Sequence, residues 1–180
     1  MEQGVPAPGP DVHRPKRSHR CCSERADARV PALVRSVLIV CEGNICRSPI
    51  AAGVFTARFP SLDIQSAGLR ASLGHLAHPF AIQTCASNGI DIGSHRSKPI
   101  SADLLKHADL VLTMEAAQMD HVLRAYPWCT GKVRTFASPP LRDLPDLLGE
   151  PLEAYERFHA QAVDSSRYWS TFLDRSTSGS

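Results

Sequence analysis

The sequence predicts an α/β fold, in which a four-stranded parallel sheet has helices on both faces. Two observations support this class. Short runs of aliphatic and β-branched residues alternate along the chain with longer stretches of helical length. The most apolar of these runs are apolar at nearly every position, as expected for strands buried on both faces. A sheet of this kind has right-handed crossovers and binds ligands beyond the carboxyl ends of its strands.

The elements are expected in a regular order from Ser36 onwards. Ser48 and Pro49 suit the N-cap and the first position of a helix, and Gly89 suits the end of another. The aromatic residues of the last segment lie near one face, which is typical of a buried stripe. We expect strands over residues 36–40, 62–66, 109–113 and 132–136, and helices beginning at residue 48 and covering 79–88, 115–125 and 151–172.

The chain length suits one domain, which we place at residues 36–175. Residues 1–35 contain five prolines and almost no periodic apolar residues, so they are predicted to form a flexible N-terminal extension. The Cys21-Cys22 pair in this extension lacks a familiar metal-ligand spacing. We therefore predict no metal and no other cofactor.

Charge and hydropathy exclude several classes of function. Residues 1–35 carry 7 Lys/Arg and 4 Asp/Glu, whereas the rest carries 13 and 14, so the predicted domain is nearly neutral. A nucleic-acid partner is not expected, because such proteins need a basic face. No apolar run approaches the ~20 residues of a membrane span, and the N-terminus lacks the apolar core of a signal peptide. We expect a cytoplasmic location, with reduced cysteines.

The segment between the first strand and the first helix, residues 41–48, has the spacing Cys-x5-Arg-Ser. The backbone N–H groups of such a loop, together with the N-terminus of the following helix, form a concave anion site. Gly43 and Asn44 are residue types that tolerate the left-handed conformations of a tight cradle. The context of strand, loop and helix is therefore the one that a phosphate-binding loop needs.

Three side chains in this loop indicate the chemistry. Dipoles and an arginine around Cys41 favour the thiolate, which is the nucleophilic form of cysteine. Arg47 offers a planar fork that holds two phosphoryl oxygens. Ser48 can donate a hydrogen bond toward the sulfur. We predict a phosphatase with Cys41 as nucleophile and Arg47 as phosphate clamp, whose phosphate-binding residues are Glu42, Gly43, Asn44, Ile45, Cys46, Arg47 and Ser48.

The stretch Val40-Cys41-Glu42-Gly43-Asn44-Ile45-Cys46-Arg47-Ser48-Pro49 resembles the full signature of the low-molecular-weight protein tyrosine phosphatases. The resemblance covers nearly all of residues 36–172 and is strongest to bacterial members that act beside tyrosine autokinases in exopolysaccharide and capsule export. It implies phosphotyrosine hydrolysis through a phosphocysteine, phosphotyrosine proteins as partners, and a bacterial tyrosine autokinase as one candidate. Further matching segments are Ser66-Ala67-Gly68-Leu69, Gly89-Ile90-Asp91, Ser94-His95-Arg96, Leu110-Val111-Leu112-Thr113-Met114-Glu115 and Leu152-Glu153-Ala154-Tyr155-Glu156-Arg157.

The same resemblance assigns supporting roles within the site. Asn44, Ser66 and His95 match the residues whose hydrogen bonds hold the loop in the family. Cys46 matches the second loop cysteine, which is thought to trap oxidised Cys41 as a disulfide. Neither role follows from the local spacing alone.

Phosphate transfer from tyrosine needs a proton for the leaving phenolate. The family supplies it from an aspartate before the last helix, usually within Asp-Pro-aromatic. Two aspartates compete here, and the preceding proline and the distance to the last helix favour Asp146 over Asp143. The sequence departs from the pattern at Leu147, which is expected to loosen the loop. It departs again at Leu148, which is expected to keep an apolar wall without aromatic stacking.

Two alternatives remain open at this point. An arsenate reductase shares the fold, but it requires a closely spaced cysteine pair, and Cys85 and Cys129 are far apart in the sequence. A weakly active phosphotyrosine-binding regulatory module is the second alternative, because Leu147 and Leu148 depart from the family pattern.

Overall fold

The computed structural model describes residues 33–141 and 143–173 and confirms the predicted fold class. Its four strands form one sheet in the order β2-β1-β3-β4, and every neighbouring pair is parallel. Each strand lies within two residues of its predicted bounds. The strands are β1 (Ser36–Cys41), β2 (Asp63–Gly68), β3 (Leu110–Thr113) and β4 (Val133–Thr135).

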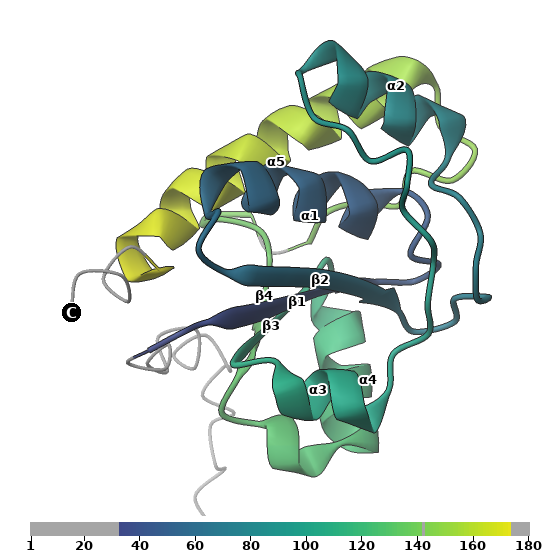
Figure 1. Ribbon diagram of the computed structural model, residues 1–180. Coiled ribbons are helices and arrows are strands. Elements are labelled where there is room, and N and C mark those ends of the chain that lie inside the picture. Colours follow the sequence, from purple (N-terminus) through teal and green to yellow (C-terminus); the bar gives the residue numbers. More distant parts are fainter. Residues whose placement is uncertain (1–32, 142, 174–180) are drawn as a thin grey trace, which may run out of the picture.

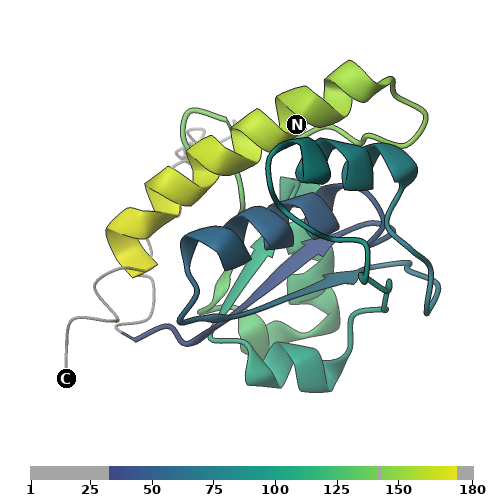
Figure 2. The same cartoon turned by 45° about the horizontal axis from the view of Figure 1, so that its top comes forward.

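Helices cover both faces of the sheet (Figure 1). On one face lie α1 (Arg47–Arg58), α2 (Pro79–Ser87) and α5 (Leu152–Leu173), and Figure 2 shows α5 running along α1. On the other face lie α3 (Ala102–His107) and α4 (Ala116–Ala125). Two apolar cores result, because successive side chains of a strand point to opposite faces. Ile39 packs into the α1–α5 core, whereas Leu38 and Val40 pack into the other.

The expected helices are present, and two short elements were not predicted from the sequence. These are α3, in which Leu105 is the buried residue, and a 3-10 turn at Pro127–Cys129. Both are too short to produce a periodic apolar pattern. The expected N-cap of α1 is wrong: the helix begins at Arg47, one residue before Ser48. Ser48 lies inside the first turn, and its hydroxyl serves the loop instead.

The packed domain begins before its predicted start at Ser36. Val34 is buried in the α1–α5 core, and the backbone N–H of Arg35 donates to the carboxylate of Asp109 at 2.8 Å. The rest of the predicted extension, residues 1–32, lies outside the described residues, as do residues 174–175 of the predicted domain. None of the described helices is both long enough and apolar enough to cross a membrane.

Candidate active site

The loop between β1 and α1, residues 41–48, surrounds the sulfur of its first residue. Cys41 ends β1 at the carboxyl edge of the sheet and is 2% exposed. Asn44 adopts a left-handed conformation, with φ of 54°, and its backbone N–H points back to Cys41 Sγ at 3.2 Å. The hydroxyl of Ser48 lies 3.0 Å from the same sulfur. The Asn44 N–H and the Ser48 hydroxyl therefore both converge on the Cys41 sulfur.

The backbone of this loop offers further donors. A helix leaves its first N–H groups without an intrahelical partner, and a loop wound around one point directs its own N–H groups inward. The structure shows no hydrogen bond, to any described residue, from the backbone N–H groups of Gly43, Ile45, Cys46, Arg47 and Ser48. Such a set of free donors is the physical basis of an anion site.

Glu42 lies at the rim of the cleft and contacts Arg70 with both its side chain and its backbone. Its carboxylate forms an ion pair with Arg70 at 3.1 Å, and its carbonyl accepts the N–H of Arg70 at 2.9 Å. The Glu42 side chain is thus directed to the next loop of the chain, so its negative charge is partly neutralised at the rim of the site.

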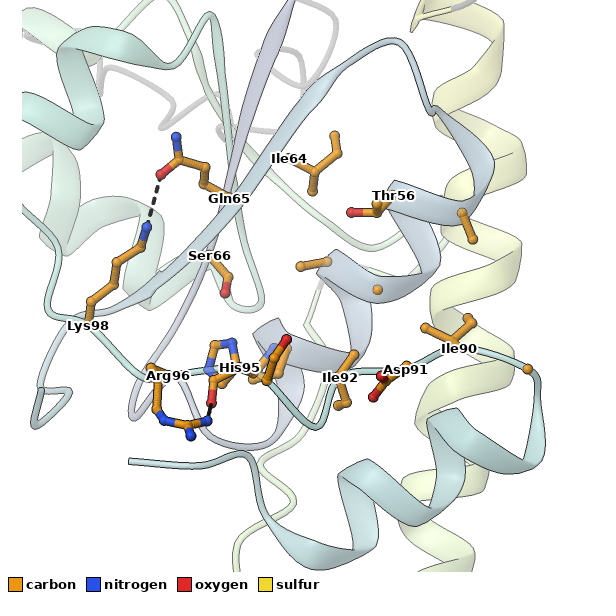
Figure 3. Close-up of a pocket in the computed structure, with 16 residues that line it drawn as sticks. Thr56, Ile64, Gln65, Ser66, Ile90, Asp91, Ile92, His95, Arg96 and Lys98 are labelled. Carbon is orange, nitrogen blue, oxygen red and sulfur yellow. Dashed lines mark hydrogen bonds between the residues drawn. The ribbon is translucent and has the colours of Figure 1, made fainter. Parts of the chain in front are cut away.

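The predicted supporting residues do come together on Asn44. Its side-chain amide donates to the hydroxyls of Ser48 and Ser66, both at 2.9 Å, and its side-chain oxygen accepts the N–H of Lys98 at 2.9 Å. Its backbone carbonyl lies 2.8 Å from Nε2 of His95. Ser66, His95 and Lys98 line a hollow of about 610 Å³ behind the loop, between β2 and α1 (Figure 3). Hydrogen bonds thus satisfy every polar group of the Asn44 side chain.

The state of the His95 ring follows from these contacts. A carbonyl can only accept, so Nε2 of His95 carries a proton and donates to Asn44. Burial lowers the pKa of His95, whereas this hydrogen bond works in the opposite direction and nearby Arg96 and Lys98 lower it further. The ring is accordingly held neutral with its proton on Nε2.

At Gly68 the end of β2 approaches the loop closely, a contact that was not predicted from the sequence. A Cβ atom there would lie 2.6 Å from the Glu42 carbonyl oxygen and 2.9 Å from the Asn44 nitrogen. No side chain fits at those separations, so the end of β2 can touch the loop only because it is glycine. Its position at the carboxyl end of a strand next to β1 was the available signal.

The side chain of Arg47 lies beside the predicted acid. Arg47 is 2% exposed, and its guanidinium donates to the carbonyl of Leu144 at 2.9 Å and to the carboxylate of Glu115. Its second terminal nitrogen lies 3.2 Å from Asp146 Oδ1. Glu115 was not predicted as a site residue. It follows β3, the strand beside β1, and the carboxyl-end rule could have indicated it.

The two candidate acids occupy different positions in one cleft of about 620 Å³. Asp143 accepts the N–H of Ala116 at 2.6 Å, at the first residue of α4. Asp146 instead faces Arg47, and its side chain remains 55% exposed. A general acid must reach a bound substrate, so this geometry favours Asp146.

Comparison with known proteins identifies the family. The family model for "Low molecular weight phosphotyrosine protein phosphatase" matches residues 36–162. The chain belongs to this family of tyrosine phosphatases. A curated relative, the probable low molecular weight protein-tyrosine-phosphatase EpsP of Ralstonia nicotianae, is 36% identical over 124 residues, which cover 69% of this chain and 86% of the relative.

Solved structures agree with this assignment. The tyrosine phosphatase Wzb from Escherichia coli K30 in complex with sulphate superposes with a TM-score of 0.74 at 31% identity, covering 77% of this chain and 98% of that one. The YwlE arginine phosphatase from Geobacillus stearothermophilus gives 0.72 at 28% identity, with coverages of 76% and 91%.

The loop before α5 differs from expectation at two positions of the phosphatase. Leu147 was expected to loosen the loop, but its side chain is 2% exposed in the α1–α5 core and its N–H donates to Asp146 Oδ1 at 2.8 Å. It therefore anchors the predicted acid. Leu148 was expected to form an apolar wall, but it is 64% exposed and does not line the cleft.

The remaining cysteines of the described part of the phosphatase are buried. Cys46 is 4% exposed, its sulfur lies 3.5 Å from the Tyr155 hydroxyl, and burial raises the pKa of its thiol. Its role in trapping oxidised Cys41 stays a prediction. Cys85 and Cys129 belong to the two different cores and lie on opposite faces of the sheet, so they cannot form the relay pair of a reductase.

Proposed function

We propose that this phosphatase hydrolyses phosphotyrosine through a phosphocysteine, with Cys41 as nucleophile, Arg47 as phosphate clamp and Asp146 as general acid. The observation that carries the proposal is the position of Cys41 Sγ, which receives the Asn44 N–H and the Ser48 hydroxyl within a loop of free N–H groups. A thiolate in that place faces the phosphorus of any phosphate bound by the loop.

The first step transfers the phosphoryl group to the enzyme. The sulfur of Cys41 attacks phosphorus, and the bond between phosphorus and the phenolic oxygen breaks. The protonated carboxyl of Asp146 gives its proton to that oxygen, so tyrosine leaves as the neutral phenol. The loop N–H groups and Arg47 stabilise the negative charge on the equatorial oxygens.

The second step restores the enzyme. The carboxylate of Asp146 takes a proton from water, the water oxygen attacks phosphorus, and the sulfur–phosphorus bond breaks. Cys41 returns as the thiolate and inorganic phosphate is released. One carboxyl group thus serves as acid and then as base.

The contacts of Arg47 imply an exchange of partners when substrate binds. Its guanidinium contacts Glu115, Asp146 and the Leu144 carbonyl. A phosphate dianion in the loop competes for the same N–H groups, because bidentate phosphate binding uses the guanidinium fork. Loss of the contact with Arg47 frees the Asp146 side chain to approach the leaving oxygen.

The expected substrates are phosphotyrosine proteins, with a bacterial tyrosine autokinase as one candidate and exopolysaccharide production as the process. The resemblance of residues 36–172 to bacterial phosphatases of such systems supports this proposal, as does the similarity to the phosphatases EpsP and Wzb. We also propose a cytoplasmic location, where a cysteine nucleophile stays reduced.

The test compares wild type with Cys41→Ser on p-nitrophenyl phosphate, a phosphotyrosine peptide and a phosphoarginine peptide. Wild type should hydrolyse the first two, and the variant should lose turnover but still bind vanadate, since a hydroxyl does not ionise as a thiol does. Near-normal turnover in the variant would contradict the mechanism. Faster hydrolysis of phosphoarginine would transfer the proposal to the activity of the YwlE-type neighbours, and binding without turnover would favour a regulatory module.

A further inference from the structure

The cleft that contains Arg47 continues along one side of α4. The N-cap residue of this helix, Glu115, contacts Arg47, and the helix then runs away from the phosphate loop on its own face of the sheet (Figure 1). The α4 residues that line the cleft are Ala117, Gln118, His121 and Arg124. A peptide bound with its phosphotyrosine in the loop would find this helix side as one wall of its path.

Most charged groups along the cleft already have partners. Glu115 and Asp146 contact Arg47, the carboxylate of Glu42 pairs with Arg70, and Asp143 accepts the first N–H of α4. Together these groups comprise four carboxylates and two guanidinium groups, a formal charge of −2 near the loop. The remaining charged or titratable side chains of the cleft are His121 and Arg124, both exposed.

Among the described residues, no partner is found for Arg124, a cation that lines this cleft. It forms no ion pair with any described residue, and Asp120, one helical turn earlier, lies outside ion-pair distance of it. Its place in the last turn of α4 suits the helix dipole. Arg58 has the same place in α1, is also exposed, and lines neither hollow. What distinguishes Arg124 is its position on the wall of the substrate cleft.

We propose that Arg124, with His121 beside it, selects substrates that carry an acidic side chain about four residues from the phosphotyrosine. This proposal rests on the proposed function. Arg124 is nine residues after Glu115, which corresponds to about 13.5 Å along a helix. An extended peptide covers that length in about four residues, at about 3.3 Å each. A carboxylate at that spacing reaches the free guanidinium while the phosphate occupies the loop.

The experiment uses phosphotyrosine peptides that are identical except for Glu or Gln three or four residues before or after the phosphotyrosine. For wild type at low salt, kcat/KM should be about two- to fivefold higher for the Glu peptide than for the Gln peptide at one of these positions. In Arg124→Gln this ratio should fall to one, whereas Arg58→Gln should keep the wild-type ratio. The ratio should also approach one near 1 M salt, where the screening length is about 3 Å.

Reversing the charge at position 124 distinguishes recognition of the peptide's charged side chain from a merely structural effect of the substitution. Arg124→Glu should prefer a Lys peptide over the Gln peptide at the same position and discriminate against Glu. Equal rates for Glu and Gln peptides in wild type at all four positions would overturn the proposal, as would an unchanged ratio in Arg124→Gln. If wild type hydrolyses none of the peptides, the proposed function fails. Dissociation constants of the same peptides for Cys41→Ser then give the selectivity ratio independently, and equal constants would overturn it.

Discussion

The phosphate loop is held in two different ways on its two sides. Its rear, which we define as Asn44, Ser66, His95 and the N–H of Lys98, is a neutral hydrogen-bond network in which every group of Asn44 is satisfied. Its front, defined as Arg47, Glu115 and Asp146, is a cluster of charges with one fully buried cation and two partly exposed carboxylates.

This difference between the rear and the front implies different contributions to the stability of the loop and to the rate of turnover. The rear has no partner to exchange during the reaction, so it can fix the conformation of the loop permanently. Under the proposed function, a phosphate replaces the contacts at the front, so its groups satisfy each other only until substrate binds. Substitutions at the front should therefore change rates more than stability, and substitutions at the rear should change both.

The largest effect at the front is expected for Arg47→Lys. An ammonium is a point charge and cannot reproduce the planar fork, so kcat/KM for p-nitrophenyl phosphate should fall by about 10³–10⁵. Steady-state kinetics measure the loss, and circular dichroism should show an intact fold. Activity within tenfold of wild type would show that the fork is not the phosphate clamp.

Asp146→Asn should come next. Loss of a general acid slows the reaction by about 10²–10⁴ for substrates with a poor leaving group, and much less for p-nitrophenyl phosphate, whose phenolate needs no proton. Asp143→Asn is the matched control, because it lies in the same cleft but serves the start of α4. A leaving-group dependence in the Asp143 variant instead would reverse the assignment of the acid.

At the rear, Asn44→Ala should lower the free energy of unfolding by about 1–3 kcal/mol, because buried partners lose their hydrogen bonds. Alanine is also strained at the φ of 54° found there. Asn44→Gly removes the same side chain without that strain and should be the more stable of the two. Urea titration of both variants provides the measurement; wild-type stability in either would show that the rear does not hold the loop.

The smallest expected effect concerns pH. Burial lowers the pKa of His95, so below its ordinary value of about 6.5 the unfolded chain takes up the proton more readily than the folded chain. This contribution to stability is present above that pH and is lost as pH falls. Between pH 7.5 and 5, the melting temperature of wild type should therefore drop by on the order of 1–3 °C more than that of His95→Gln. Parallel pH profiles would assign the dependence to other groups.

The features of the fold and the site that could be predicted from the sequence are those that depend on residues close to each other in the chain. The loop from Cys41 to Ser48 follows an apolar strand and precedes a helix, so its place in the fold was predictable from neighbouring residues. Glu115 and Gly68 were not assigned roles: their positions at strand ends were a signal, but their contacts depend on which strand ends meet at the sheet edge. Ser48 was misassigned as an N-cap because its hydroxyl hydrogen-bonds within the loop instead.

The contacts of Cys46 bear on when the enzyme becomes competent during its synthesis. Its sulfur lies beside Tyr155, a separation of 109 positions in the chain, and Tyr155 is a fully buried residue of α5. Arg47 and Asn44 likewise meet residues made long after them, up to Asp146 and Lys98. Cys41, the proposed nucleophile, emerges from the ribosome near the start of the domain, yet its surroundings are complete only after α5 has emerged. A nascent chain that has released β1, β2 and β3 alone would carry the thiol and its loop, but it would lack Asp146 and the contact of Cys46 with Tyr155.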